Sequence, residues 1–175
     1  MENKRLKLPA GIQTFEKLRE ENCVYVDKTH HFIHLIEQGS VYFLSRPRRF
    51  GKSLTISTFD ALFSGKKELF KGLYAEEFFN RPEFKPRPVI RLDMSGVETY
   101  KGIEEIEISL QFITSCVAQK LDIEVTEALS PSKIFKQLIR NAAEKYDSKV
   151  VVLIDEYDKP FSRILKRIIG KHSLR

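Results

Sequence analysis

The hydrophobic positions of the chain follow two patterns along its 175 residues. In the first pattern, apolar side chains recur at steps of three and four residues, which is the spacing of an amphipathic helix. This pattern predicts helices over residues 14–20, 29–38, 52–64, 66–77, 103–121, 131–142 and 160–175. Thr14 and Ser130 are placed to cap two of these helices at their N-termini. Gly39 and Gly65 follow the ends of two others.

The second pattern consists of short apolar runs without helical spacing, which predict strands. Residues 41–44 show no alternation with polar side chains, so we expect them to be buried on both faces, as strands of a parallel sheet are. Residues 89–94 and 150–154 are the predicted second and third strands, and residues 24–27 form a further β-type run. Because helices alternate with strands, we expect an α/β domain with a parallel sheet.

The segment between residues 41–44 and the helix that starts at Lys52 carries the clearest chemistry. It ends in Gly51-Lys52-Ser53, the last part of the phosphate-binding pattern G-x-x-x-x-G-K-[ST], the Walker A motif, while Arg46 replaces the first glycine. In such a loop, backbone N–H groups bind phosphates, the lysine supplies positive charge, and the hydroxyl holds Mg²⁺. The candidate nucleotide-binding residues are Arg46, Pro47, Arg48, Arg49, Phe50, Gly51, Lys52, Ser53 and Leu54.

A second candidate feature is the acidic pair Asp155 and Glu156, which directly follows the predicted strand at 150–154. Ligands bind outside the carboxyl ends of strands in open α/β sheets, and the candidate phosphate loop lies at the same edge. As in a Walker B motif, Asp155 is expected to hold Mg²⁺ through water, beside Ser53. Glu156 is expected to orient and help deprotonate the attacking water, with a structural salt bridge as its alternative role. The candidate catalytic residues are therefore Lys52 and Glu156, and the expected cofactors are ATP and Mg²⁺.

Composition narrows the function classes only moderately. The net charge of +6 and the pI near 9.3 fit a nucleotide or nucleic-acid partner, but many domains without such partners share these values. Cys23 and Cys116 lie far apart and have no ligand at metal-binding spacing, so we expect free thiols in a reducing compartment. No apolar run approaches the roughly 18 residues of a membrane span, and no signal peptide is recognisable. We therefore expect a cytoplasmic protein without a membrane partner.

With these motifs, the chain resembles the predicted AAA-ATPase-like family of bacteria and archaea. The resemblance extends over residues 7–161, and its motifs occur in the family's order. It is carried by Leu8-Pro9-Ala10-Gly11-Ile12, Phe15, Tyr25-Val26-Asp27-Lys28-Thr29, the segment from Phe43 to Ser53, Leu69-Phe70-Lys71-Gly72-Leu73, Pro88-Val89-Ile90-Arg91-Leu92-Asp93 and Leu153-Ile154-Asp155-Glu156-Tyr157-Asp158-Lys159-Pro160. Arg-Pro-Arg-Arg-Phe-Gly-Lys-Ser is the usual loop in that family, so Arg46 in place of glycine is a family feature.

The resemblance implies a P-loop NTPase-type three-layer fold and Mg-dependent ATP hydrolysis. Members typically join this ATPase domain to a C-terminal PD-(D/E)xK nuclease-like domain, so such a domain or nucleic acid is an implied partner. Further strands downstream of Asp155 are also implied, one of them between the loop strand and the Asp155 strand. The sequence ends at Arg175 without them, so we expect a C-terminally truncated chain with an incomplete sheet.

Within the chain we expect an N-terminal arm and helix at 1–40, a partial ATPase core at 41–161 and a basic helical tail at 162–175. Two alternatives to an ATPase stay open. One is a non-catalytic remnant that binds only nucleotide or a partner, and the other is a nucleic-acid-associated module whose basic loops hold DNA. The role of the Asp27-Lys28-Thr29 motif is open as well: these residues either flank the base of the nucleotide or brace the N-terminal arm.

Overall fold

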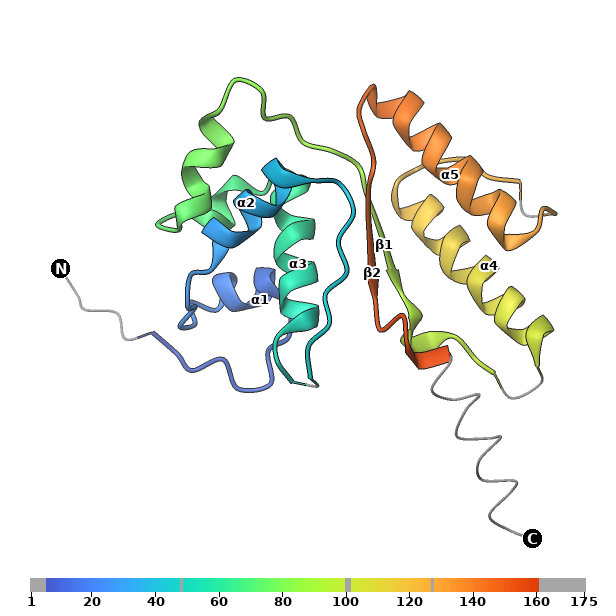
Figure 1. Cartoon of the computed structure of the whole chain (residues 1–175), viewed down its shortest axis with the longest axis horizontal. Coiled ribbons are helices and arrows are strands. Elements are labelled where there is room, and N and C mark those ends of the chain that lie inside the picture. The colour runs from blue at the N-terminus through green and yellow to red at the C-terminus, as the bar shows by residue number, and fades with distance from the viewer. Residues whose placement is uncertain (1–5, 48, 100–101, 127, 161–175) are drawn as a thin grey trace, which may run out of the picture. The chain divides into compact units, whose positions relative to one another are not determined.

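The computed structural model describes residues 6–47, 49–99, 102–126 and 128–160. The chain divides into two compact units, Met1–Arg87 and Pro88–Arg175 (Figure 1). Each unit has its own hydrophobic core. The combination of helices with parallel strands agrees with the expected α/β class. Within these residues, no helix is both long and apolar enough to cross a bilayer. The predicted helical tail at 162–175 lies outside the described residues.

The first unit is helical. Its elements are α1 Phe15–Glu20, α2 Thr29–Gln38, α3 Lys52–Phe63 and the 3₁₀ helices η1 Lys67–Phe70 and η2 Tyr74–Asn80. The apolar spacing predicts α1, α2 and α3 correctly, and Gly39 follows the end of α2 as expected. Buried side chains from all five elements form one core, which contains Phe15, Ile33, Ala61, Leu62, Phe70 and Ala75.

Asp27 and Thr29 join the start of α2 to η2. Oδ1 of Asp27 accepts hydrogen bonds from the N–H and the hydroxyl of Thr29, at 2.8 and 2.7 Å. Oδ2 of Asp27 accepts from the N–H of Tyr74 at 2.7 Å, and the buried Thr29 hydroxyl oxygen accepts from the N–H of Ala75 at 3.0 Å. These contacts give Asp27 and Thr29 a structural role, in which they join the start of α2 to η2.

The strand predicted at 41–44 is wrong. These residues have no strand conformation, and Val41 and Phe43 are 90% and 70% exposed. A strand needs a neighbour that accepts and donates its backbone hydrogen bonds, and within the described part of the first unit no strand lies beside this segment. The absence of alternating polar residues predicted that this segment would be buried, but its side chains are exposed.

Two further segments of the first unit differ from expectation. Residues 24–27 form no strand, and the nearest pairing is a single parallel bridge between Lys7 and Cys23. Residues 66–77 show helical spacing, but they form η1 and the start of η2 instead of an α-helix. Short 3₁₀ turns keep apolar side chains on one side of the chain, so the spacing alone does not distinguish them from an α-helix.

The second unit combines two helices with two parallel strands. Its elements are β1 Val89–Asp93, the 3₁₀ helix η3 Met94–Gly96, α4 Ile103–Lys120, α5 Pro131–Tyr146 and β2 Val151–Asp155. The sequence pattern predicts both strands and both α-helices at these positions. Pro131 occupies the first helical position of α5 as expected, although the side chain of Ser130 makes no capping hydrogen bond.

The helices α4 and α5 lie side by side and pack on β1 (Figure 1). Ile90 and Leu92 of β1 are buried there with Ala118, Ile123, Leu138 and Ala142. In the parallel register Ile90 pairs with Val152 and Leu92 pairs with Ile154. Residues two apart in a strand lie on the same face, so both pairs project from the same face of the sheet. Val152 and Ile154 are nevertheless 37% and 43% exposed, so the helices cover β1 more completely than β2.

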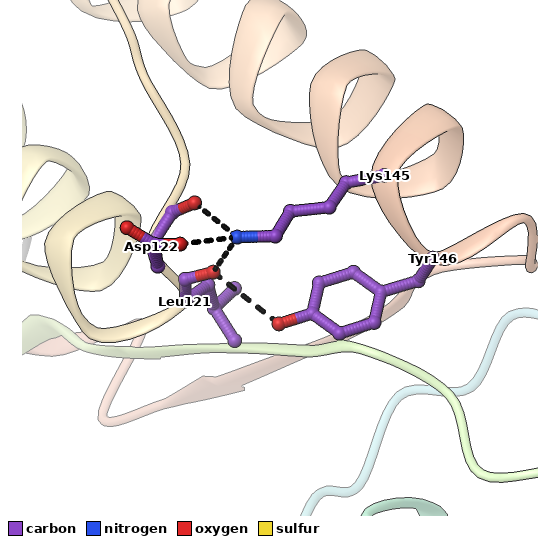
Figure 2. A network of polar contacts seen from close by, with 4 residues as sticks. All are labelled: Leu121, Asp122, Lys145 and Tyr146. Atoms are coloured by element: carbon purple, nitrogen blue, oxygen red, sulfur yellow. Dashed lines mark hydrogen bonds and ion pairs between the residues drawn. The ribbon is translucent and has the colours of Figure 1, made fainter.

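A polar network also joins the C-terminal ends of α4 and α5 (Figure 2). Lys145 Nζ donates to the carbonyl oxygens of Leu121 and Asp122 and to the Asp122 carboxylate, which is 2.7 Å away. The Tyr146 hydroxyl donates to the Leu121 carbonyl at 3.3 Å. These hydrogen bonds go to carbonyl groups after the end of α4, which have no hydrogen-bond donor within that helix. The hydrogen bond from Lys145, together with its charge, lowers the pKa of Asp122.

A first prediction concerns Gly51, which precedes α3 with a left-handed φ of 73°. Gly51→Ala should lower the free energy of unfolding, measured in urea, by about 1 kcal/mol because L-residues disfavour this conformation. A Cβ at this position meets no atom within 4 Å, so the loss would be conformational and not steric. Gly51→Asn is the control, because asparagine tolerates the left-handed region better than alanine. A loss for alanine no larger than for asparagine would contradict this account.

A second prediction concerns Asp27. Burial alone would raise the pKa of Asp27, but hydrogen bonds from Tyr74 and Thr29 outweigh it and hold the pKa below its ordinary value. Asp27→Ala should reduce the free energy of unfolding at pH 7 by about 1–3 kcal/mol, since its donors lose their acceptor. Glu77→Ala, an exposed carboxylate in η2, should change it by less than about 0.5 kcal/mol.

The effect of Asp27 should also depend on pH. A carboxylate whose pKa is lowered by folding stabilises the protein above its unfolded pKa of about 4, and this stabilisation is lost as the pH falls through the folded pKa. The difference between the unmodified protein and Asp27→Ala should therefore shrink below about pH 4. An equal difference at pH 7 and at pH 3 would show that the charge of Asp27 contributes nothing.

Candidate functional site

The predicted phosphate loop is a tight turn that leads into α3. The N–H of Phe50 donates to the Pro47 carbonyl at 3.4 Å, and the N–H of Thr55 donates to the Gly51 carbonyl at 2.8 Å as α3 begins. Arg49 and Gly51 both have left-handed backbones, with φ of 66° and 73°. Left-handed residues are common in the turns whose backbone N–H groups form anion-binding concavities.

Lys52 closes this loop. Its Nζ donates to the Arg46 carbonyl at 2.8 Å and to the Pro47 carbonyl at 3.3 Å. Both acceptors are neutral, and no carboxylate pairs with Lys52 in the part of the chain that the structure describes. The positive charge of the ammonium group is therefore held beside the loop without being neutralised.

The N-terminus of α3 is open to an anion. Gly51 has no side chain with which to cap the helix. The N–H groups of Lys52, Ser53 and Leu54 lie in the first turn, so they have no hydrogen-bond acceptor within the helix. The first turn contains no acidic residue that would offset the positive end of the helix dipole. Backbone donors, helix dipole and ammonium group are the features that a site for phosphate or another anion would need.

A buried hydroxyl network holds the first turn of α3 in place. Ser57 Oγ and Thr58 Oγ1 both donate to the Leu54 carbonyl, at 2.9 and 2.8 Å. Ser57 Oγ also accepts from the N–H of Phe15 at 2.9 Å, which ties α3 to the start of α1. Burial raises the pKa of Tyr25, although its side-chain hydrogen bond with Thr58 acts in the opposite direction.

Sequence reasoning missed this network. A signal for half of it exists, because Ser57 and Thr58 lie three and four residues after Leu54, where hydroxyls inside a helix bond to the carbonyl of the preceding turn. The other half, the bond from Phe15, joins residues 42 positions apart and has no local signature.

The acidic pair lies at the carboxyl end of β2, as predicted. Asp155 is only 5% exposed, and its Oδ1 accepts from the N–H of Glu156 at 2.9 Å. Glu156 is half-buried and has a left-handed φ of 53°. Its Oε2 lies 3.7 Å from Lys159 Nζ, so the salt bridge considered as an alternative role is present in a loose form.

The structure adds a third carboxylate to this end of the sheet. Asp93 stands opposite Asp155 in the parallel register, at the end of β1. Its Oδ1 accepts from the N–H of Ser95 at 2.9 Å, which starts the turn of η3. The position of Asp93 at the end of a predicted strand is a sequence signal for such a neighbour. Only the strand register identifies Asp93 as the residue opposite Asp155.

The candidate residues fall into two groups. The structure brings Arg46, Pro47 and residues 49–54 together in the first unit, while Arg48 lies outside the described residues. Asp155 and Glu156 belong to the second unit.

A small hollow of about 160 Å³ lies near the C-terminal end of α3. It is lined by Ile36, Glu37, Phe63, Phe78, Arg81, Glu83, Phe84, Lys85 and Arg87. At 1.5 Å per residue, the end of α3 at Phe63 is about 16 Å from Lys52. The hollow is therefore separate from the phosphate loop.

Comparison with known proteins identifies the family. A family described as Predicted AAA-ATPase matches residues 9–174 of the chain. The chain is also 42% identical over 164 residues to an "Uncharacterized protein in vnfD 5'region" of Azotobacter chroococcum mcd 1. This alignment covers 93% of the chain and 31% of that relative, and no solved structure matches. The chain therefore belongs to the predicted AAA-ATPase-like family.

Proposed function

We propose that the chain binds Mg-ATP at the N-terminus of α3 and takes part in its hydrolysis within a longer protein. The observation that carries this proposal is the closed loop, in which Lys52 Nζ bonds to the Arg46 and Pro47 carbonyls directly before an uncapped helix. Membership in a predicted AAA-ATPase family independently supports a nucleotide as the anion. A nuclease-like domain in the longer protein is part of the same proposal.

In this proposal the first turn of α3 binds the β- and γ-phosphates. The N–H groups of Lys52, Ser53 and Leu54 donate to phosphate oxygens, and the Lys52 ammonium balances their charge. The exposed Arg46 and Arg49 lie on the same loop and add positive charge beside the phosphates. The hydroxyl network around Leu54 keeps these donors in position, because it fixes the turn from which they project.

Ser53 and Asp155 have the donor chemistry for Mg²⁺. Both supply hard oxygen atoms, the kind of ligand that this ion prefers. The hydrogen bond from the N–H of Glu156 orients the Asp155 carboxylate at the end of β2. The ion would supply positive charge against the phosphate oxygens.

Glu156 is the proposed general base. Its carboxylate would orient the attacking water and accept a proton from it. The present contact with Lys159, at 3.7 Å and partly exposed, is weak enough to be exchanged for that role. Its place directly after Asp155 puts the metal ligand and the base on one strand end.

Replacing Lys52 tests nucleotide binding. Lys52→Ala should weaken the binding of a fluorescent ATP analogue at least about tenfold, since a charge-assisted hydrogen bond to phosphate is lost. Lys71→Ala, which removes an exposed lysine from the same unit, is the matched control and should bind normally. If both variants bind as tightly as the unmodified chain, the loop is not the nucleotide site.

Replacing Glu156 tests hydrolysis separately. Glu156→Gln should reduce phosphate release from ATP at least about a hundredfold while nucleotide binding is retained, because the amide cannot accept the proton. Asp158→Asn, the same change at an exposed carboxylate two residues further on, should leave the rate near that of the unmodified protein. Nucleotide binding without phosphate release from the unmodified protein would favour a binding-only function.

A further inference from the structure

A second apolar face of α4 takes no part in the core of the second unit. The core face is well buried, and Thr114 and Ala118 on it are 4% and 1% exposed. Ile108 and Phe112 are 65% and 69% exposed, and the exposed Cys116 follows at the same spacing. Residues four apart lie one above the other on a helix, so these three side chains form a continuous ridge. Single exposed hydrophobic side chains are common, but a continuous ridge indicates a contact surface.

Charged residues continue the same spacing at both ends of the ridge. Glu104 lies four residues before Ile108, Lys120 lies four residues after Cys116, and both charged side chains are exposed. Neither forms an ion pair with any residue in the described part of the chain. The ridge is therefore symmetric in position about Phe112, with a carboxylate at one end and an ammonium group at the other.

The charges at the ends of the ridge are complementary to those of a second copy that runs in the opposite direction. When two copies of α4 lie antiparallel about a two-fold axis at Phe112, Glu104 of each copy comes opposite Lys120 of the other. A parallel pair would instead bring like charges together. At about 100° per residue, Glu104 and Lys120 lie roughly 80° to either side of Phe112, so they flank the apolar centre where long side chains reach across.

We propose that this α4 ridge, formed by Glu104, Ile108, Phe112, Cys116 and Lys120, is an interface between two copies of the chain. The ridge of each helix packs into the groove beside the ridge of the other, as in the commonest class of helix packing. Burial of Ile108 and Phe112 drives the association, and the charged ends select the antiparallel direction. One helix from each copy makes a small contact, so the dimer is weak and depends on concentration. The inference does not depend on nucleotide binding.

Disulfide cross-linking tests the register. In the antiparallel pair, residue 108 of one copy lies beside Cys116 of the other, so Ile108→Cys should give covalent dimers under mild oxidation on a non-reducing gel. Two unmodified Cys116 side chains would be about 12 Å apart along the helices, beyond the roughly 7 Å between Cα atoms that a disulfide spans. The unmodified protein should therefore cross-link little.

The matched control is Glu107→Cys, an exposed position next to Ile108 but off the ridge. It should cross-link no more than the unmodified protein. If Ile108→Cys gives no more covalent dimer than Glu107→Cys, the proposed register is overturned. Loss of the Ile108→Cys dimer when Cys116 is also changed to serine would support the register.

Charge exchange tests the direction by sedimentation equilibrium. Glu104→Lys and Lys120→Glu each place like charges opposite one another at both ends, so each should raise the dimer dissociation constant on the order of tenfold. The double variant restores both pairs and should return to within about threefold of the unmodified value. Unchanged helix content by circular dichroism separates these effects from misfolding. A monomer at every concentration, or a double variant weaker than both single variants, would overturn the proposal.

Discussion

The buried hydroxyl of Ser57 is the contact on which the orientation of the predicted phosphate loop depends. It accepts the N–H of Phe15 and donates to the carbonyl of Leu54, so one oxygen atom joins the start of α1 to the first turn of α3. Phe15 is fully buried, and a shift of α3 would leave its N–H without an acceptor. Such a loss costs on the order of 1–3 kcal/mol, which keeps the first turn of α3 at a fixed place in the first unit.

The support of this loop is helical. The preceding segment at 41–44 forms no strand, and its side chains are largely exposed. Instead, the packing of α1, α2 and α3 with η1 and η2 holds α3, and the Asp27–Thr29 contacts fasten that cluster at a second place. The loop itself is closed by contacts within seven residues, from Arg46 to Lys52. Its shape is therefore local, while its orientation is set by the core.

Local patterns explain which parts of the fold the sequence predicts. α2 and α5 follow from apolar spacing because each buries one stripe of side chains, and β1 and β2 follow from apolar runs that have each other as neighbours. The run at 41–44 is also apolar and rich in residues that favour strands, but strand formation requires a neighbouring strand as well, which composition does not report.

The site shows the same division between local and long-range information. The loop from Arg46 to Leu54 could be proposed from the sequence because its expected chemistry depends on consecutive residues. The bond from Phe15 to Ser57 spans 42 positions, and the pairing of Asp93 with Asp155 depends on strand register. Neither contact produces a pattern within a short window of sequence. Only the folded chain therefore reveals the contact that supports the loop and the third carboxylate at the strand ends.

Glu156 has a left-handed backbone, which for a residue with a side chain costs roughly 1–2 kcal/mol. Glycine would adopt this conformation without that cost, so the glutamate is kept at a position where backbone energetics favour another residue. Residues held in this way concentrate at sites where the side chain has work to perform. In the proposed role of Glu156 as a base, stability and activity would oppose each other at the end of β2, and a search for more stable variants would select against its carboxylate.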